Sequence, residues 1–349
     1  MLLHRHVVRW LPVGGLLLLV LAVPRAAGDT FQWSKYEGYP DAWYDSFEAK
    51  EIARNVLSWQ SPAGSWPQDI DTGENKYEGD PKELKGTFES GASTGELRYL
   101  ARIFRVGKDE RYGDAFDKGL KHILDAQYPT GGWPAFAPPP KMTYERHIAF
   151  HDYCQANILH LLREIANAKQ YSFLRKDKRD TIRDVFERGI ECMVKCQIVV
   201  KNQRTGWCAL HDEVTLQPRA GSKYEPVAIY SAETASNLLF LMTVKDPSPA
   251  VIKAVHGGCQ WQERVKLAGI KLAVKDGVVA VVRDTKAPYL WTQYYEIETG
   301  KSMFLTQNAT VKYKFTDIEP AMRGAFMWYG PWGRDVISAY AKWKTKFPQ

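Results

Sequence analysis

The chain has 349 residues, of which 45% are hydrophobic, and it carries a formal net charge of +7 at pH 7. This length is enough for one large core or two smaller ones. The first 28 residues contain three arginines and no acid, so the chain without them has a net charge of +4 (7 minus 3). Such a small excess excludes nucleic acid as the expected partner, although it is compatible with an acidic polymer.

The N-terminus has the pattern of a secretory signal peptide. A basic start is followed by an apolar run from 11 to 23 and by the small residues Ala26-Ala27-Gly28, which suit a cleavage site. We therefore predict a signal peptide over residues 1–28 and a mature protein that is secreted or periplasmic. A retained membrane anchor is the alternative, but Gly and Pro interrupt the run, and no later stretch is long and apolar enough to cross a bilayer.

Helical patterns fill the middle of the chain. The spacing of apolar residues predicts helices at 45–59, 91–106, 110–126, 152–169, 178–196, 231–244 and 248–267. A repeat runs through them, in which a helix is followed by a Gln and by a short loop with a Gly–Trp pair or near-pair. Its tryptophans, Trp66, Trp133 and Trp207, lie 67 and 74 residues apart. Each repeat therefore reads as a helical hairpin, with its Trp loop at the same end of the array.

These hairpins predict a mainly α fold, an incomplete α/α toroid with a cleft for an extended chain at one end. The pattern changes after residue 270, where short strands are expected at 278–282, 289–297 and 303–306, and a final helix at 334–346. We expect a single domain over residues 29–349. Its helical part covers 29–270, and its part of short strands and coil covers 271–349.

The cysteines are predicted to be mostly small buried hydrophobic residues. Their odd number excludes complete internal pairing, although an exported protein leaves room for one or two disulfides. The five are Cys154, Cys192, Cys196, Cys208 and Cys259.

Acids and bases gather in the loops that precede the predicted helices. Glu89 and Asp152 lie at the starts of two helices, and Lys223 comes shortly before a third. If these helices begin at the same end of the array, the side chains line one wall of a cleft. In the simpler interpretation the carboxylates only cap helices, and His147 and His151 are loop residues. The sequence has no P-loop, dinucleotide-binding glycine pattern, HExxH motif or nucleophile elbow.

The loops resemble those of a known family, the pectic acid (polygalacturonate) lyases of polysaccharide lyase family 10. The likeness covers nearly all of the mature chain, from about 55 to 344, and its segments follow in the family order. They are Gly64-Ser65-Trp66-Pro67, 87–99, 126–134, 147–152, 207–212, Tyr224-Glu225 and Trp328-Tyr329-Gly330.

The resemblance implies anti β-elimination on polygalacturonate. A base removes the proton at C5 of a galacturonate and the bond to the C4 oxygen breaks, while Ca²⁺ held by oxygen ligands neutralises the sugar carboxylate. Glu89 and Asp152 match acids of the family, which implies that they are catalytic residues and metal ligands. The base of the family is an arginine. Without a gap it aligns with Ser222, which makes the neighbouring Lys223 a second candidate for the base.

Two further arginines of the family, which bind substrate carboxylates, are also replaced. They align with Gln293 and Gln307, so these glutamines are candidate substrate contacts, together with Trp133, Arg146 and His147. A glutamine can hydrogen-bond a neutral or less charged sugar, but it lacks the charge-assisted contact worth roughly 1.5–3 kcal/mol. Trp133, like Trp66 and Trp207, also suits a packing role in its loop.

Three outcomes stay open: a lyase with altered preference, such as for methyl-esterified or other uronides, a weak lyase, and a carbohydrate-binding protein on the same scaffold. An intact cluster of Lys223, Glu89 and Asp152 favours catalysis, whereas an exposed lysine that points away favours binding alone. An α/α-toroid glycoside hydrolase is a further alternative, with Glu89 and Asp152 as the pair to test. We expect a monomer with Ca²⁺ as cofactor and an acidic polysaccharide as substrate.

Overall fold

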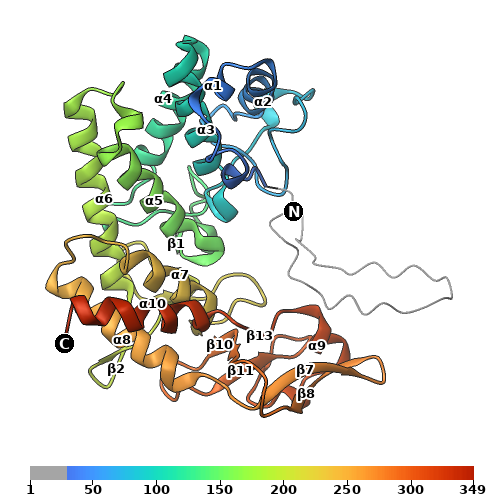
Figure 1. Ribbon diagram of the computed structural model, residues 1–349. Coiled ribbons are helices and arrows are strands. Elements are labelled where there is room, and N and C mark those ends of the chain that lie inside the picture. Colours follow the sequence, from blue (N-terminus) through green and yellow to red (C-terminus); the bar gives the residue numbers. More distant parts are fainter. Residues whose placement is uncertain (1–29) are drawn as a thin grey trace.

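The computed structural model describes residues 30–349, so the predicted signal peptide at residues 1–28 lies outside the described part of the chain. Three helical hairpins follow one another down the molecule in Figure 1, namely α3 (Thr94–Gly107) with α4 (Glu110–Asp125), α5 (Cys154–Asn167) with α6 (Lys176–Cys196), and α7 (Ser231–Leu241) with α8 (Pro249–Val265). The other α-helices are α1 (Asp41–Tyr44), α2 (Phe47–Ser58), α9 (Pro320–Ala325) and α10 (Gly333–Lys346). The prediction of helical hairpins is confirmed, and the closure of these hairpins into an incomplete toroid stays a prediction.

Local signals in the sequence set the ends of these helices. Ser46 Oγ accepts a hydrogen bond from Ala49 N before α2 (3.1 Å), and Ser248 caps α8 in the same way. These hydroxyls satisfy backbone donors that the first turn of a helix leaves unpaired. Lys108 follows the end of α3 in the left-handed conformation, with φ 57°, which reverses the chain toward α4.

The Trp-bearing loops are equivalent in structure, as the repeat predicts. Each tryptophan of the repeat is fully buried, and its indole Nε1 donates to a backbone carbonyl of the preceding helix at 2.7–2.8 Å, from Trp66 to Val56, from Trp133 to Ile123 and from Trp207 to Met193. The packing role suggested for these rings is therefore confirmed. The Trp133 ring has no exposed surface, so its position does not support the predicted contact with a substrate, which stays a prediction.

A glutamine joins each repeat to the next. Its amide nitrogen donates to a loop carbonyl of its own repeat and to a carbonyl in the second helix of the following hairpin. Since buried amides need such partners, each glutamine fixes one register between neighbouring repeats. The pairs, at 2.8–2.9 Å, are Gln60 with Ala115, Gln127 with Val185 and Gln197 with Ala254.

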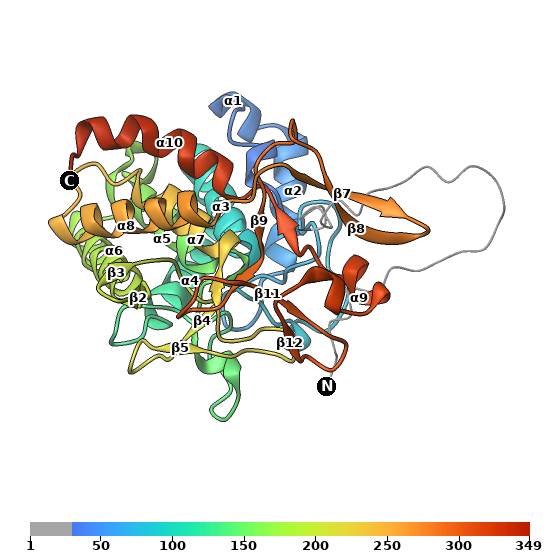
Figure 2. The ribbon, with the colours of Figure 1, turned by 90° about the horizontal axis from the view of Figure 1, so that it is seen from below.

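Short strands build the C-terminal part. β7 (Ile270–Lys275) and β8 (Val278–Arg283) form a hairpin that extends away from the three helical hairpins in Figures 1 and 2. A four-stranded sheet has the order β12–β11–β10–β6 and so includes a strand from directly before α7, which joins the two parts of the chain. Its strands are β6 (Ile229–Tyr230), β10 (Tyr294–Tyr295), β11 (Ser302–Leu305) and β12 (Val311–Lys312). The remaining strands are β1 (Ile148–Ala149), β2 (Val199–Val200), β3 (Gln203–Arg204), β4 (Leu210–His211), β5 (Pro218–Arg219), β9 (Trp291–Thr292) and β13 (Tyr329–Gly330).

Two clusters of buried apolar side chains correspond to these parts, the larger between the helices and the smaller around β6, β10 and β11. All five cysteines are buried and unpaired within residues 30–349, which confirms their prediction as small hydrophobic residues. In the same part of the chain, no helix combines the length and the apolar content needed to cross a membrane.

Candidate functional site

The loops that lead into α3 and α5 have the same backbone form. Phe88 and Phe150 are buried, and each of their amides donates to the carbonyl two residues after the Trp of the next repeat (2.9 and 2.8 Å). Two positions further on, Ser90 and Asp152 are both left-handed, with φ of 53° and 50°. The two loops can therefore be matched residue by residue.

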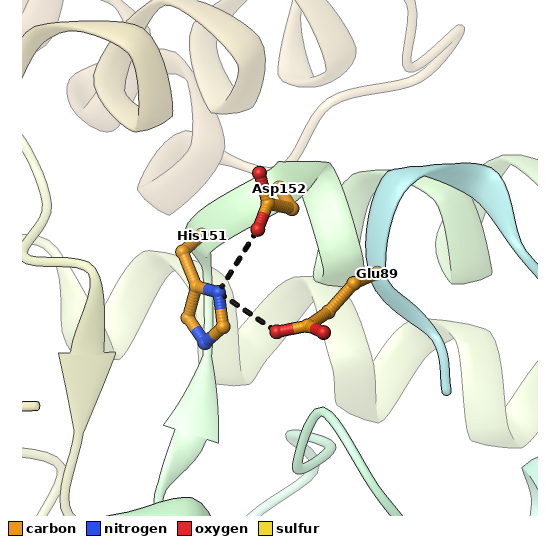
Figure 3. A group of neighbouring side chains, drawn as sticks. All are labelled: Glu89, His151 and Asp152. Carbon is orange, nitrogen blue, oxygen red and sulfur yellow. Dashed lines mark hydrogen bonds and ion pairs between the residues drawn. The ribbon is translucent and has the colours of Figure 1, made fainter. Parts of the chain in front are cut away.

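This match places Glu89 and His151 at equivalent positions. They begin the 3₁₀ turns η3 (Glu89–Gly91) and η5 (His151–Tyr153), which pack against each other. His151 Nδ1 lies 3.1 Å from Glu89 Oε1 and 3.4 Å from Asp152 Oδ2, so one imidazole nitrogen stands between two carboxylates (Figure 3). We call Glu89, His151 and Asp152 the helix-mouth cluster.

The cluster extends from a buried acid to an exposed one. The side chain of Glu89 is 7% exposed and that of Asp152 is 57% exposed. Burial lowers the pKa of His151, but the hydrogen bonds and charges of Asp152 and Glu89 outweigh it and raise that pKa well above its ordinary value. At neutral pH the His151 imidazolium thus balances part of the negative charge of Glu89 and Asp152. The sequence indicated the two acids, but it gave His151 only a loop role.

Glu233 adds a further carboxyl near the cluster. It lies in the first turn of α7, and its Oε2 is buried without a hydrogen-bond partner among the described residues. Burial first, and then the charge of Asp152, raise the pKa of Glu233 to about 7. The sequence interpretation missed Glu233, although the repeat holds a signal. Glu233 directly precedes Thr234, whose Oγ1 accepts a hydrogen bond from the amide of Trp207 (3.1 Å). In the two earlier repeats a residue at the start of a helix also accepts the amide of the Trp, so the repeat places Glu233 at a helix start.

Arg146 and His147 belong to a second polar group. Arg146 Nε donates to Glu213 Oε1 (2.6 Å), and His147 Nδ1 lies 2.9 Å from Glu213 Oε2. Next to Glu213, Asp212 pairs with Arg219 at 3.0 Å. The spacing of His147, Asp212 and Glu213 would suit a metal ion, but arginines already compensate both acids. Both predicted substrate contacts are thus engaged with Glu213, a residue that the sequence did not single out.

Lys223 is not joined to the helix-mouth cluster. Its Nζ lies over the ring of Tyr224, 5.1 Å from the centroid, and the exposed side chain forms no ion pair within residues 30–349. Ser222 is exposed as well, and its backbone amide donates to Glu225 Oε2 (2.7 Å). The expected cluster of Lys223 with the two acids is therefore not formed, and His151 stands between the acids instead. The catalytic roles of Lys223 and Ser222 stay predictions.

The two glutamines at the arginine positions differ in their surroundings. Gln293 Oε1 is buried and has no hydrogen-bond partner in the described chain, while its backbone carbonyl accepts the amide of Ser231 at the start of α7 (3.0 Å). Gln307 is exposed, and its carbonyl accepts the hydroxyl of Tyr224 (2.9 Å). Gln293 therefore offers an unused acceptor close to α7, and Gln307 lies beside the segment that carries Lys223.

The helix-mouth cluster has the ligand atoms for a metal ion. Those of Glu89, His151 and Asp152 lie within 4.8 Å of one another. Ca²⁺ takes six to eight oxygen ligands, and the carboxylates of Glu89 and Asp152 suit it, whereas the imidazole between them has to turn aside. The two acids therefore fit a divalent cation as two of its oxygen ligands.

Two solved structures that share this fold are polysaccharide lyases. The family 10 polysaccharide lyase from Cellvibrio cellulosa matches with a TM-score of 0.76 and 26% identity over 88% of this chain and 97% of that chain. A mutant of that lyase, solved with trigalacturonic acid, matches with the same TM-score and identity over 87% of this chain and 97% of that chain. The family model for pectic acid lyase matches residues 60–337, so the chain belongs to the pectic acid lyase family, and the resemblance is confirmed. No curated protein matches the chain.

Proposed function

We propose that this protein cleaves a uronic-acid polysaccharide, polygalacturonate or a relative, by β-elimination. The observation that carries the proposal is the helix-mouth cluster, which joins Glu89 and Asp152 in a chain of the pectic acid lyase family. The complex of the C. cellulosa lyase with trigalacturonic acid supports an acidic sugar as the ligand. We further propose a secreted or periplasmic monomer whose hairpins form an incomplete α/α toroid.

In this proposal the cluster acts on the sugar carboxylate. A Ca²⁺ ion held by Glu89 and Asp152 would neutralise that carboxylate and make the C5 proton more acidic. The protein keeps Glu89 in one orientation, because Thr87 Oγ1 donates to Glu89 Oε2 (3.2 Å) while Oε1 faces His151. The unused acceptor of Gln293 suits a hydroxyl of the sugar chain.

Lys223 is the proposed base, with Ser222 beside it. To reach a C5 proton, its side chain has to leave the Tyr224 ring. A cation–π contact at an exposed site is worth about 0.5–1 kcal/mol, so this movement costs little. Lysine accepts a proton only as the neutral amine, which the site must favour when substrate excludes water.

Binding without cleavage is the second candidate function. The position of Lys223 favours it, since the exposed ammonium rests on Tyr224 and is not paired with Glu89 or Asp152. The replacement of the family arginines by Ser222, Gln293 and Gln307 points the same way, because a scaffold can keep a sugar site after losing its base.

The experiment follows ultraviolet absorbance of the unsaturated product from polygalacturonate and, separately, from methyl-esterified pectin, with Ca²⁺ or with EDTA. Lys223→Ala is compared with Lys301→Ala, a matched control because Lys301 Nζ also lies over a tyrosine ring, 5.8 Å from the centroid of Tyr313. A signal that is lost only in Lys223→Ala supports the proposal. A signal that survives in Lys223→Ala assigns the base elsewhere, and binding without any signal supports the second function.

A further inference from the structure

Tyr153 has an unusual backbone conformation in the turn that carries the helix-mouth cluster. Its φ of 63° and ψ of 18° are left-handed, directly after the left-handed Asp152. Bulky residues rarely adopt this conformation, because Cβ comes too close to a carbonyl oxygen. The equivalent residue of the preceding repeat is Gly91, with φ 84°, and glycine adopts such a φ without that cost. Tyr153 therefore occupies a position where the preceding repeat has glycine, the residue that adopts this conformation most easily.

The side chain of Tyr153 does not offset this cost through specific contacts within the protein. It is 48% exposed, and it forms no hydrogen bond and no ring contact among residues 30–349. Two other surface tyrosines differ in this respect, since Tyr224 donates its hydroxyl to Gln307 and Tyr313 donates its hydroxyl to Glu296. A strained residue with an unengaged side chain beside a candidate site is a feature that function can explain.

The location of Tyr153 identifies the kind of ligand. Tyr153 directly follows Asp152 in η5, and this turn packs against η3 and against α7, the helix that carries Glu233 in its first turn. The ring offers a flat apolar surface with a polar edge. A pyranose ring has a matching form, with a face of C–H bonds and hydroxyls around its rim.

We propose that Tyr153 forms a binding subsite for a sugar ring, in which the pyranose unit next to the one at the helix-mouth cluster packs its C–H face on the phenol. The left-handed backbone holds the ring in place for this contact, and Tyr153 takes no part in proton transfer. The inference rests on the proposed function, because the ligand is a unit of the same polysaccharide.

The test uses Tyr153→Ala, Tyr153→Gly and Tyr153→Phe, with Tyr313→Ala as the matched control, since Tyr313 is also 48% exposed. Affinity for oligogalacturonides is measured by calorimetry, together with KM and kcat on polygalacturonate and on methyl-esterified pectin. We expect Ala and Gly to weaken binding equally, by about tenfold, with little change in kcat. Phe keeps the stacking surface, so its affinity should stay within about threefold of the wild type. Gly should also melt above Ala by about 1–2 °C, because it relieves the left-handed strain.

Three results contradict the subsite. One is an unchanged affinity in Tyr153→Ala while the wild type binds, which leaves the proposed function in place. Another is a loss of affinity that follows the melting temperature, with Gly less affected than Ala, which indicates a structural role. The third is a wild type that neither cleaves nor binds either polysaccharide, which overturns the proposed function and the subsite with it.

Discussion

Glu96 is a buried carboxyl that should make the stability of the protein depend on pH. Its side chain has no exposed surface, Thr72 Oγ1 donates to its Oε1 (3.0 Å), and its Oε2 has no hydrogen-bond partner among the described residues. Burial raises the pKa of Glu96 from 4.5 to about 8. The folded protein thus holds a proton that the unfolded chain releases above pH 4.5. The stabilisation is complete below pH 4.5 and is lost as the pH rises through about 8.

The substitution Glu96→Gln isolates this effect, because glutamine has the shape of the protonated acid and does not ionise. The pKa of Glu96 in the folded protein exceeds its ordinary value by about 3.5 (8 minus 4.5). This difference corresponds to a loss of unfolding free energy on the order of 4–5 kcal/mol between low and high pH. We expect the variant to be within about 1 kcal/mol of the wild type at low pH and several kcal/mol more stable above pH 8.

Urea unfolding of both proteins in acidic and in alkaline buffer measures the difference. Glu187→Gln is the control, because Glu187 is exposed on α6 and its replacement should change stability by less than about 0.5 kcal/mol in either buffer. A difference between Glu96→Gln and the wild type that is the same in both buffers refutes the reasoning, since it means that the carboxyl ionises in the folded protein without cost.

Three further predictions concern the repeat and the site. Gln127→Ala removes the hydrogen bonds from Gln127 Nε2 to the carbonyls of Gly131 and Val185 and should lower the unfolding free energy by about 1–3 kcal/mol in urea titrations. An equal loss on replacing a surface glutamine contradicts the role of Gln127 in joining the repeats. His151→Ala removes the cation between the two carboxylates, so calorimetry should show Ca²⁺ binding about tenfold tighter, and unchanged binding argues against metal at the helix-mouth cluster. Gln307→Arg restores a cation at an exposed position and should tighten binding of polygalacturonate in low salt by about tenfold, an effect that added salt should weaken.

The helices and the repeat were predictable because their signals are local. Apolar spacing predicted seven of the eight α-helices before residue 270, with ends within three residues, and missed only the four-residue α1. The Gly–Trp loops marked the repeat, since a glutamine and a buried indole recur at each loop. Glu89 and Asp152 were also predictable, because each lies at the start of a helix.

The composition of the site depends on features that no periodicity encodes. The left-handed turn at Asp152, with φ 50°, brings His151 onto Glu89, and a residue pattern alone does not specify that turn. Glu233 escaped notice because its burial depends on how α7 packs beside the other loops. The contact of Lys223 with the Tyr224 ring is a side-chain choice on the surface, where packing imposes little.

The buried tryptophans and glutamines also affect how such a chain can change over generations. None of their anchoring hydrogen bonds uses an atom of Glu89, His151 or Lys223. Mutations at Glu89, His151 or Lys223 can therefore accumulate without removing these bonds, so the register of the repeats and the chemistry of the site depend on separate residues. An arginine at the site can therefore be replaced by a glutamine, and the sugar preference can change, without compensating substitutions in the core.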